Sequence, residues 1–141
     1  MEAIQDSGVG MVINCNELGG TLIPKPFERF VKIVMAPETQ PYIKDISISM
    51  GYFSPHCSND LHIHEEGAEL IYIISGYGKT VIGDQTFDIG PNSMLINPKG
   101  VWHQQINESD TTMQLLAIWV PAVSGDSIVS RAVKSAQNIH V

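Results

Sequence analysis

The chain has few cysteines and few basic residues. Cys15 and Cys57 are the only cysteines among 141 residues, which excludes a fold stapled by several disulfides. Because they lie far apart in a chain that we expect to stay in a reducing compartment, we predict that both thiols are reduced. Lys and Arg together number 8 against 15 Asp and Glu, and the net charge is −7. No basic cluster is available to follow a phosphate backbone, which argues against nucleic acid as a partner.

Long apolar runs are also missing. No stretch approaches the roughly 18 consecutive apolar residues that a membrane span needs, and residues 1–30 contain no basic start followed by an apolar block. We therefore expect no membrane partner and a cytoplasmic location. Apolar residues make up 43% of the chain and charged residues 16%, a balance typical of a compact globular protein. A chain of this length predicts one domain with one core.

A helical period is absent from most of the chain, where short β-type runs occur instead. Turn residues such as Gly83-Asp84 and Gly90-Pro91 separate these runs, which predicts strands joined by tight turns. Only residues 129–136 fit a short helix. The predicted strands cover residues 30–35, 43–53, 70–74, 79–82, 86–89, 93–96, 102–106 and 113–120. Short strands in this number indicate an all-β fold, an antiparallel sandwich or barrel.

The N-terminal segment differs from the rest. Residues 1–28 mix Gly and Pro with brief apolar pieces such as Met11-Val12-Ile13, which indicates an arm with short strands rather than a domain. We divide the chain into this arm, a barrel over residues 29–122 and a C-terminal tail over residues 123–141. An arm of this kind can exchange an edge strand between two subunits and cover exposed sheet edges, so we expect a homodimer.

Three of the five histidines stand where one ion can gather them. On a strand, His62 and His64 point to the same side, with roughly 6 to 7 Å between their attachment points. A turn at Glu66-Gly67 can bring Glu69 back beside them, which gives two imidazoles and one carboxylate around one metal. His103 lies on a later strand, and a barrel brings distant strands to face one interior. It would complete a site of three His and one Glu.

The same residues also fit an arrangement without chemistry. A His-x-His pair on a strand is more often incidental than metal-binding, and Glu65, Glu66 and Glu69 also fit a solvated turn. The spacing alone leaves both interpretations open.

The residues around His62 and those around His103 match the two sequence motifs of a known family. The spacings H-x-H-x4-E-x6-G and P-x-G-x2-H-x3-N are met by His62, His64, Glu69, Gly76, Pro98, Gly100, His103 and Asn107. In these motifs the chain resembles the cupins over roughly residues 46–120, and in particular the small single-domain bacterial cupins of the cupin 2 conserved barrel type. The resemblance implies a double-stranded β-helix, or jelly-roll barrel. It also implies one divalent transition metal whose ligands are His62, His64, Glu69 and His103. Imidazole-rich ligation without thiolate suits Fe, Ni, Mn, Zn or Cu and does not choose among them.

Two positions depart from the motifs. Each motif opens with a glycine, and His56 and Asn92 stand at those places. Asn tolerates a left-handed backbone better than other non-glycine residues, so we expect Asn92 to keep its turn. His56 fits an exposed loop, and the alternative is a role facing the substrate or supporting a metal ligand.

Strand alternation predicts which other side chains share the site. Gln105 and Asn107 lie on the face of His103 and are candidates to orient a ligand or a substrate. Ile71 and Ile73 should give the pocket an apolar wall. Tyr72 and Trp102 should point away, and Trp119 should serve packing. The sequence names no catalytic acid or base.

The predicted site is locally positive, because a divalent ion outweighs one carboxylate. It therefore favours a small anionic or carboxylate-bearing ligand. The leading hypothesis is a metal-dependent enzyme with dioxygenase, decarboxylase, isomerase or lyase chemistry. The alternative is a non-catalytic cupin that binds or senses a small ligand. A third hypothesis, a metal that serves stability alone, predicts a site closed to solvent.

Overall fold

The computed structural model of the chain describes residues 1–137. Residues 138–141, the end of the predicted tail, lie outside the described residues. The elements, in chain order, are β1 (Ile4–Asp6), β2 (Met11–Ile13), η1 (Cys15–Glu17), β3 (Thr21–Ile23), β4 (Arg29–Met35), β5 (Ser47–Phe53), β6 (Ala68–Ser75), β7 (Gly78–Ile82), β8 (Gln85–Ile89), β9 (Met94–Asn97), β10 (His103–Asn107), β11 (Met113–Val120) and α1 (Gly125–Gln137).

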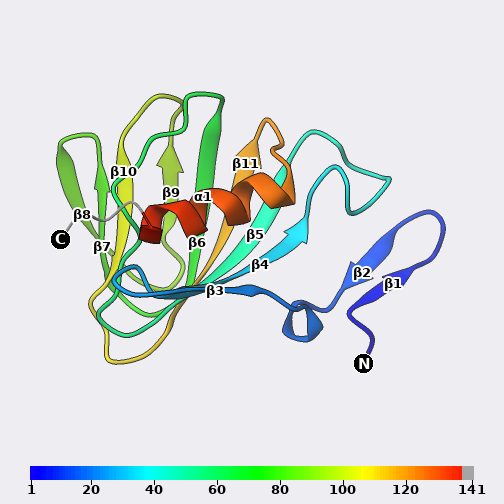
Figure 1. The fold of residues 1–141 in the computed structure, drawn as a ribbon, viewed down its shortest axis with the longest axis horizontal. Coiled ribbons are helices and arrows are strands. Elements are labelled where there is room, and N and C mark those ends of the chain that lie inside the picture. The colour runs from blue at the N-terminus through cyan, green and yellow to red at the C-terminus, as the bar shows by residue number, and fades with distance from the viewer. Residues whose placement is uncertain (138–141) are drawn as a thin grey trace.

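Two antiparallel sheets form the body of the protein (Figure 1). The larger sheet has six strands in the order β3-β4-β5-β11-β6-β9, and the smaller has three in the order β10-β7-β8. Neighbours in the larger sheet, such as β5 and β11, are far apart in sequence, which is the pattern of a jelly roll. This arrangement confirms the predicted all-β, antiparallel cupin fold.

The predicted strand over residues 43–53 begins too early. In the structure β5 starts at Ser47, and the preceding residues form a loop. The side-chain oxygen of Gln40 accepts hydrogen bonds from the backbone N–H groups of Tyr42 and Ile43, each at 2.8 Å. These local bonds occupy backbone donors that a strand would offer to a neighbour.

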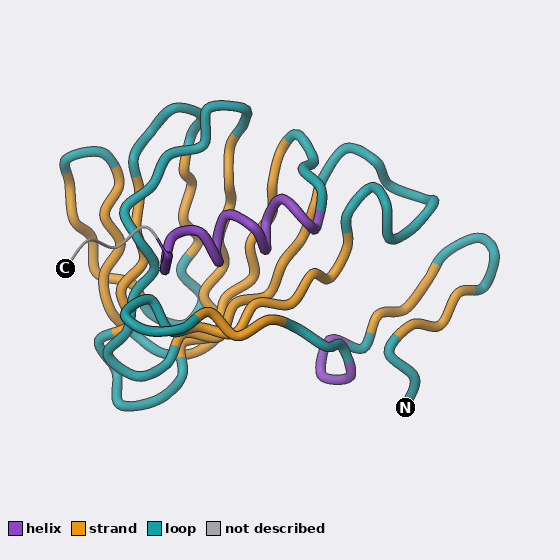
Figure 2. The backbone as a smooth tube through the Cα atoms, viewed as in Figure 1, coloured by secondary structure: helices purple, strands orange, loops and turns teal. Residues whose placement is uncertain are grey.

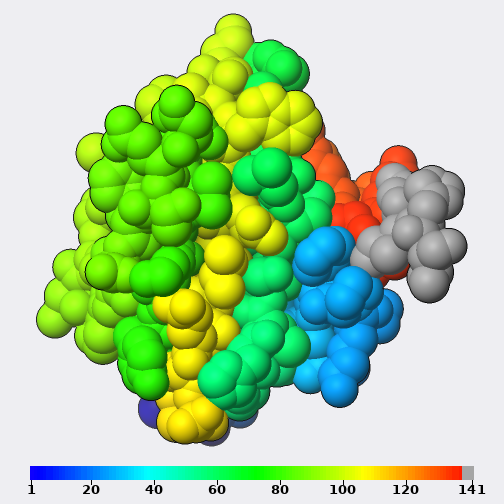
Figure 3. Space-filling model, turned by 90° about the vertical axis from the view of Figure 1, so that its left-hand side faces the viewer, coloured from blue at the N-terminus to red at the C-terminus, as the bar shows by residue number. Residues whose placement is uncertain are grey.

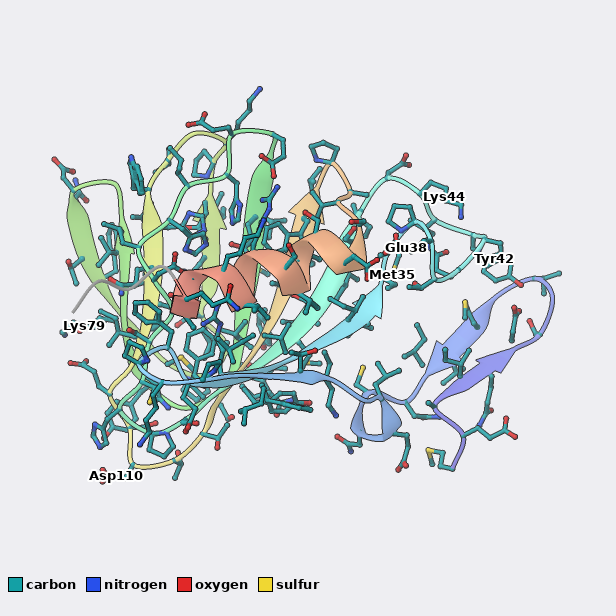
Figure 4. The ribbon with its side chains drawn as sticks, viewed as in Figure 1. Met35, Glu38, Tyr42, Lys44, Lys79 and Asp110 are labelled. Atoms are coloured by element: carbon teal, nitrogen blue, oxygen red, sulfur yellow. The ribbon has the colours of Figure 1, made fainter. Side chains whose placement is uncertain are left out.

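The segment predicted as an N-terminal arm has two parts. Strands β1 and β2 form a hairpin that projects away from the body (Figure 1), whereas β3 pairs with β4 and extends the larger sheet. Tyr42, labelled in Figure 4, donates a 2.5 Å hydrogen bond to Asp6 of the hairpin. The hairpin is thus tied to the body through a side chain on the loop before β5.

Helix α1 (purple in Figure 2) packs against β3 and β4 of the larger sheet and is longer than the predicted helix over residues 129–136. Its inner face packs Ile128 and Ala132 onto a buried cluster with Ile23, Val31 and Trp119. Within residues 1–137, no helix has the length and apolar character needed to cross a membrane. Cys15 and Cys57 are both free.

Candidate metal centre

A cavity of about 370 Å³ lies against the inward face of the larger sheet. Two small residues on the inward face of β5, Ser49 and Gly51, leave room for it, and Ile71, Leu115 and Ala117 form an apolar wall. Ile71 and Ile73 share the buried face of β6 as predicted, but of the two only Ile71 lines the cavity, and Tyr72 lies on the opposite face. The volume is within the range of small-molecule sites.

The two histidine motifs meet through backbone pairing. The amide of His62 donates to the carbonyl of His103 at 3.0 Å, and the amide of His103 donates back at 2.8 Å. Figure 3 shows the segment before β6 (green-teal) side by side with β10 (yellow). Residues 62–64 were predicted as part of a strand, but only His62 takes part in an isolated bridge. The long loop, rather than strand alternation, sets the direction of these side chains.

Four side chains, which we name the tetrad, converge on one point: His62, His64, Glu69 and His103. One candidate ligand atom from each lies within 4.8 Å of the others. Nε2 of His103 is 2.9 Å from Oε1 of Glu69, and Nε2 of His64 is 3.4 Å from the same oxygen. His64, Glu69 and His103 are buried, while 22% of the His62 side chain is exposed. The tetrad therefore has one side open to solvent.

Two of the histidines are oriented as metal ligands usually are. Nδ1 of His62 lies 2.8 Å from the carbonyl of Asp60, and Nδ1 of His103 lies 3.1 Å from the carbonyl of Val101. Because a carbonyl only accepts, each Nδ1 carries a proton. Nε2 of the neutral His62 ring therefore presents a lone pair. Nε2 of His103 faces Oε1 of Glu69 at 2.9 Å, and to bind a metal it would have to give up that contact and any proton it donates there. These two rings, with the carboxylate of Glu69, form a donor set that fits a divalent transition metal.

His64 is oriented differently. Its Nδ1 lies 3.1 Å from a guanidinium nitrogen of Arg131 on α1, and Arg131 also pairs with Glu66. Because a guanidinium only donates, Nδ1 must accept, and the proton of the neutral ring sits on Nε2. That Nε2 is buried and has no hydrogen-bond partner. For Nε2 to bind a metal, Arg131 must release Nδ1.

The electrostatics of the tetrad favour a charged carboxylate at Glu69 and a neutral ring at His62. Burial raises the pKa of Glu69, but the hydrogen bond from His103 and the close contact of His64 outweigh it and lower the pKa to about 2. Burial, followed by the nearby charge of His103, lowers the pKa of His62. Both shifts favour the protonation states that metal binding requires.

The three other predicted site residues have different surroundings in the structure. Gln105 is buried and lines the cavity. Asn107 is also buried, but its amide holds the loop beyond β10 by donating to the carbonyls of Phe53, Ser54 and Thr111. His56 is exposed and lies 2.7 Å from Asp110, on the loop that follows the far end of β10 (Figure 4). Of the three, only Gln105 shares the cavity with the tetrad.

Two cavity residues had no assigned role at the level of sequence, and a third was expected to serve packing alone. Arg29 is buried and lines the cavity from β4; its signal was the alternation that places it in phase with Val31. Trp119, predicted to serve packing, does so, and its ring also meets that of His64 at a steep angle of 75°, with 4.6 Å between ring centroids. Arg131 reaches the site from α1, and no sequence signal indicated how that helix would dock.

Comparison with known proteins gives the family. The sequence matches the family described as "Cupin domain" over residues 50–119, the region that contains the tetrad and most of the barrel strands. The chain is a cupin. No curated protein matched the sequence.

Solved structures agree with this cupin in fold. A predicted oxalate decarboxylase from Thermotoga maritima has a TM-score of 0.71 at 21% identity, over 79% of this chain and 99% of that one. An RmlC-like cupin from Shewanella frigidimarina has a TM-score of 0.61 at 11% identity, over 77% and 88%. A structure of oxalate oxidase has a TM-score of 0.61 at 18% identity, over 69% and 53%. At these identities the likeness shows the fold alone.

The two departures of this cupin from the motifs have the same backbone explanation. His56 has φ +59° and Asn92 has φ +70°, and these are the non-glycine residues with positive φ within residues 1–137. Both stand where the motif has glycine, which adopts this left-handed conformation without penalty. The cupin turn is therefore kept at both places, as expected for Asn92.

Proposed function

We propose that this cupin is a metal-dependent enzyme that acts on a small anionic or carboxylate-bearing molecule, with the tetrad as the ligand set of one divalent transition metal. The observation that carries the proposal is the convergence of the tetrad beside a cavity of about 370 Å³, which three of its members, His62, His64 and Glu69, line. Lewis-acid or redox chemistry would come from the bound ion. The metal, whether Fe, Ni, Mn, Zn or Cu, is left to experiment.

The chain's own residues have separate tasks in this proposal. Apolar side chains such as Ile71 and Leu115 exclude water from the cavity wall, which strengthens electrostatic contacts inside it. Arg29 supplies a buried positive charge. The carboxylate of Glu69 stays ionised at neutral pH because its pKa is about 2.

A metal that only stabilised the barrel would be expected in a closed site. The exposed fraction of the His62 side chain, 22%, argues instead for access from solvent. The fold likeness to proteins described as a predicted oxalate decarboxylase and an oxalate oxidase is consistent with carboxylate chemistry, but at such low identity it is a guide for choosing test compounds.

A non-catalytic cupin that binds or senses a small ligand is the second candidate. It is favoured by one observation: apart from the tetrad, the carboxylates that line the cavity are Asp60, Glu65 and Glu66, and none of the three is buried. Within residues 1–137, no buried carboxyl, imidazole, thiol, phenol or amine outside the tetrad lines the cavity, so proton transfer would depend on the tetrad or on the rim.

The test is a turnover assay on protein loaded separately with each of the five metals. Small carboxylates and keto acids are supplied, while dioxygen uptake and carbon dioxide release are followed and products are identified by mass spectrometry. We expect turnover with one metal and its loss in His103→Ala, while His56→Ala keeps the activity because His56 lies outside the cavity. Tight binding without product for every metal would replace the enzyme with the binding module.

A further inference from the structure

Two residues that line the cavity carry side-chain nitrogen atoms that no protein group satisfies. Nε2 of Gln105 and Nε1 of Trp119 are buried and have no hydrogen-bond partner within the described part of the chain. Both residues line the cavity and are at least nine-tenths buried, with 1% and 8% exposed. Both atoms carry hydrogen and can only donate. A buried unpaired donor is costly, so these atoms indicate a ligand that accepts hydrogen bonds.

The donor character of Gln105 follows from its neighbours. Its backbone N–H donates to Oδ1 of Asn59 at 2.8 Å, so the other side-chain atom of Asn59 is the NH₂ group. That group donates to Oε1 of Gln105 at 2.9 Å, which leaves Nε2 as the unpaired end of the Gln105 amide. The amide cannot turn over without losing this bond, because two donors would then face each other.

Arg29 adds a positive charge to the same cavity. Its side chain is buried, with 7% of the residue exposed, and it packs over the ring of Phe53 at 5.8 Å. Its one side-chain hydrogen bond within residues 1–137 goes to the carbonyl of Phe27 at 2.9 Å. No carboxylate of those residues forms an ion pair with it. A buried guanidinium normally has an anionic partner.

Arg29 and Gln105 approach the cavity from adjoining segments. The residues that precede β4 (blue) lie beside the green-teal loop in Figure 3, and that loop lies beside β10. The backbone agrees, because the amide of Ser54 donates to the carbonyl of Glu28 at 3.3 Å and the amide of Asn59 donates to the carbonyl of Gln105 at 3.2 Å. Arg29 and Gln105 thus line the cavity from segments that both neighbour the loop over residues 54–59.

We propose that Arg29 and Gln105 form a carboxylate-binding subsite, and that the ligand carries one carboxylate held there and a second oxygen-bearing group that faces the tetrad. This inference rests on the proposed function and narrows its substrate class to small dicarboxylates and related acids with two oxygen functions. Trp119, whose ring contacts His64, offers its N–H to the group beside the tetrad.

The charges of the cavity support two anchoring points rather than one. Buried inside it are Arg29 and Glu69, of opposite sign, while Arg131, Asp60, Glu65 and Glu66 stand nearer the rim. Without a metal the lining is net negative. A bound divalent ion would offset the negative charge of the lining and make the buried interior net positive, so that both the metal side and the Arg29 side attract oxygen ligands.

The test measures binding of acetate, malonate and succinate by isothermal titration calorimetry, to metal-loaded and to chelator-treated protein. For the wild type we expect at least one dicarboxylate to bind about tenfold or more tightly than acetate. Arg29→Met should remove this advantage, and Arg29→Lys should keep part of it. Gln105→Glu should also remove it, because the new oxygen repels the carboxylate while Asn59 keeps its acceptor. Lys32→Met is the matched control, since Lys32 is on the same strand but binds the carbonyl of Cys15.

Metal content and thermal unfolding are measured on every variant. Arg29→Met should retain as much metal as the wild type. If the wild type itself binds no metal, the proposed function is overturned, and the titrations of chelator-treated protein still test the subsite. If Arg29→Met does not fold, Arg29→Lys and Gln105→Glu decide. Equal binding of acetate and both dicarboxylates, or variants that bind like the wild type, would overturn the subsite.

Discussion

A single hydrogen bond sets His64 apart from the other histidines of the tetrad. His62 and His103 donate from Nδ1 to backbone carbonyls, whereas His64 accepts at Nδ1 from Arg131. Alternation along β10 predicted the inward direction of His103 and Gln105, and the motif spacing predicted all four tetrad residues. The partners of the rings could not be predicted, because they depend on how a loop and a helix dock rather than on spacing.

Removal of the Arg131 guanidinium should therefore strengthen metal binding. We expect Arg131→Met to lower the Kd for Zn by about tenfold, because Nδ1 of His64 becomes free to carry the proton. Competition with a chelating dye measures the change. Lys134→Met, which removes the same charge from α1, should leave the Kd unchanged. Arg131→Met should also lower the Kd for Zn when Glu66→Gln is added both to it and to the wild type. If Arg131→Met lowers the Kd only in proteins that keep Glu66, this account is contradicted.

Acid should destabilise the metal-free protein in two steps. The pKa of His62 is lowered by burial, so its stabilising contribution is present above the unfolded value of 6.5 and is lost as the pH falls below it. The contribution of Glu69 is present above 4.5 and is lost as the pH falls toward about 2. Urea unfolding between pH 7.5 and 3 measures both. His62→Gln should flatten the upper step, and an unchanged profile would contradict the assignment.

Elements were predicted best where strands alternate and worst where side chains bind the backbone. The alternation of β6 gave the correct inward face, Ile71 and Ile73. The start of β5 was missed because Gln40 holds the preceding loop. The loop that carries His62 and His64 was predicted as a strand, although it is joined to β10 only by isolated bridges. Such loops follow tertiary contacts more than local pattern.

Two turn glycines with positive φ allow a test of element packing. Gly76, between β6 and β7, has φ +84°, and a Cβ there would lie 2.7 Å from Cα of Met113. Gly83, between β7 and β8, has φ +64° and no atom within 4 Å of such a Cβ. Gly83→Ala should lower the free energy of unfolding by about 1 to 2 kcal/mol.

Gly76→Ala should cost about 1 to 3 kcal/mol more than Gly83→Ala, because it adds overpacking against the Met113 backbone. Chemical denaturation measures both values. Equal losses would mean that the barrel absorbs the extra atom and that the close approach at Gly76 does not restrict the turn.

The whole molecule has apolar surface that the single chain leaves exposed. Met94 and Ile96 on the edge strand β9 are 55% and 62% exposed, and the projecting hairpin exposes Ile4 and Val12. Exposed strand edges and apolar side chains favour pairing with a second copy. The homodimer and the cytoplasmic location, both inferred from sequence, stay predictions.

Light scattering tests the homodimer directly. We expect a mass of twice the 15.5 kDa of the chain. The double variant Met94→Lys/Ile96→Lys places charge on the β9 edge and separates its contribution from that of the hairpin. A wild-type mass equal to one chain at micromolar concentration would contradict the prediction.

The most direct test of the central claim is the metal content of purified, untagged protein, measured by elemental analysis beside His62→Ala/His103→Ala and the control His56→Ala. The account predicts near-stoichiometric metal in the wild type and in His56→Ala, and none in the double variant, because two of four ligands at one centre are lost. A wild type that retains none of the five metals when each is supplied would contradict it, as would a double variant that binds metal like the wild type.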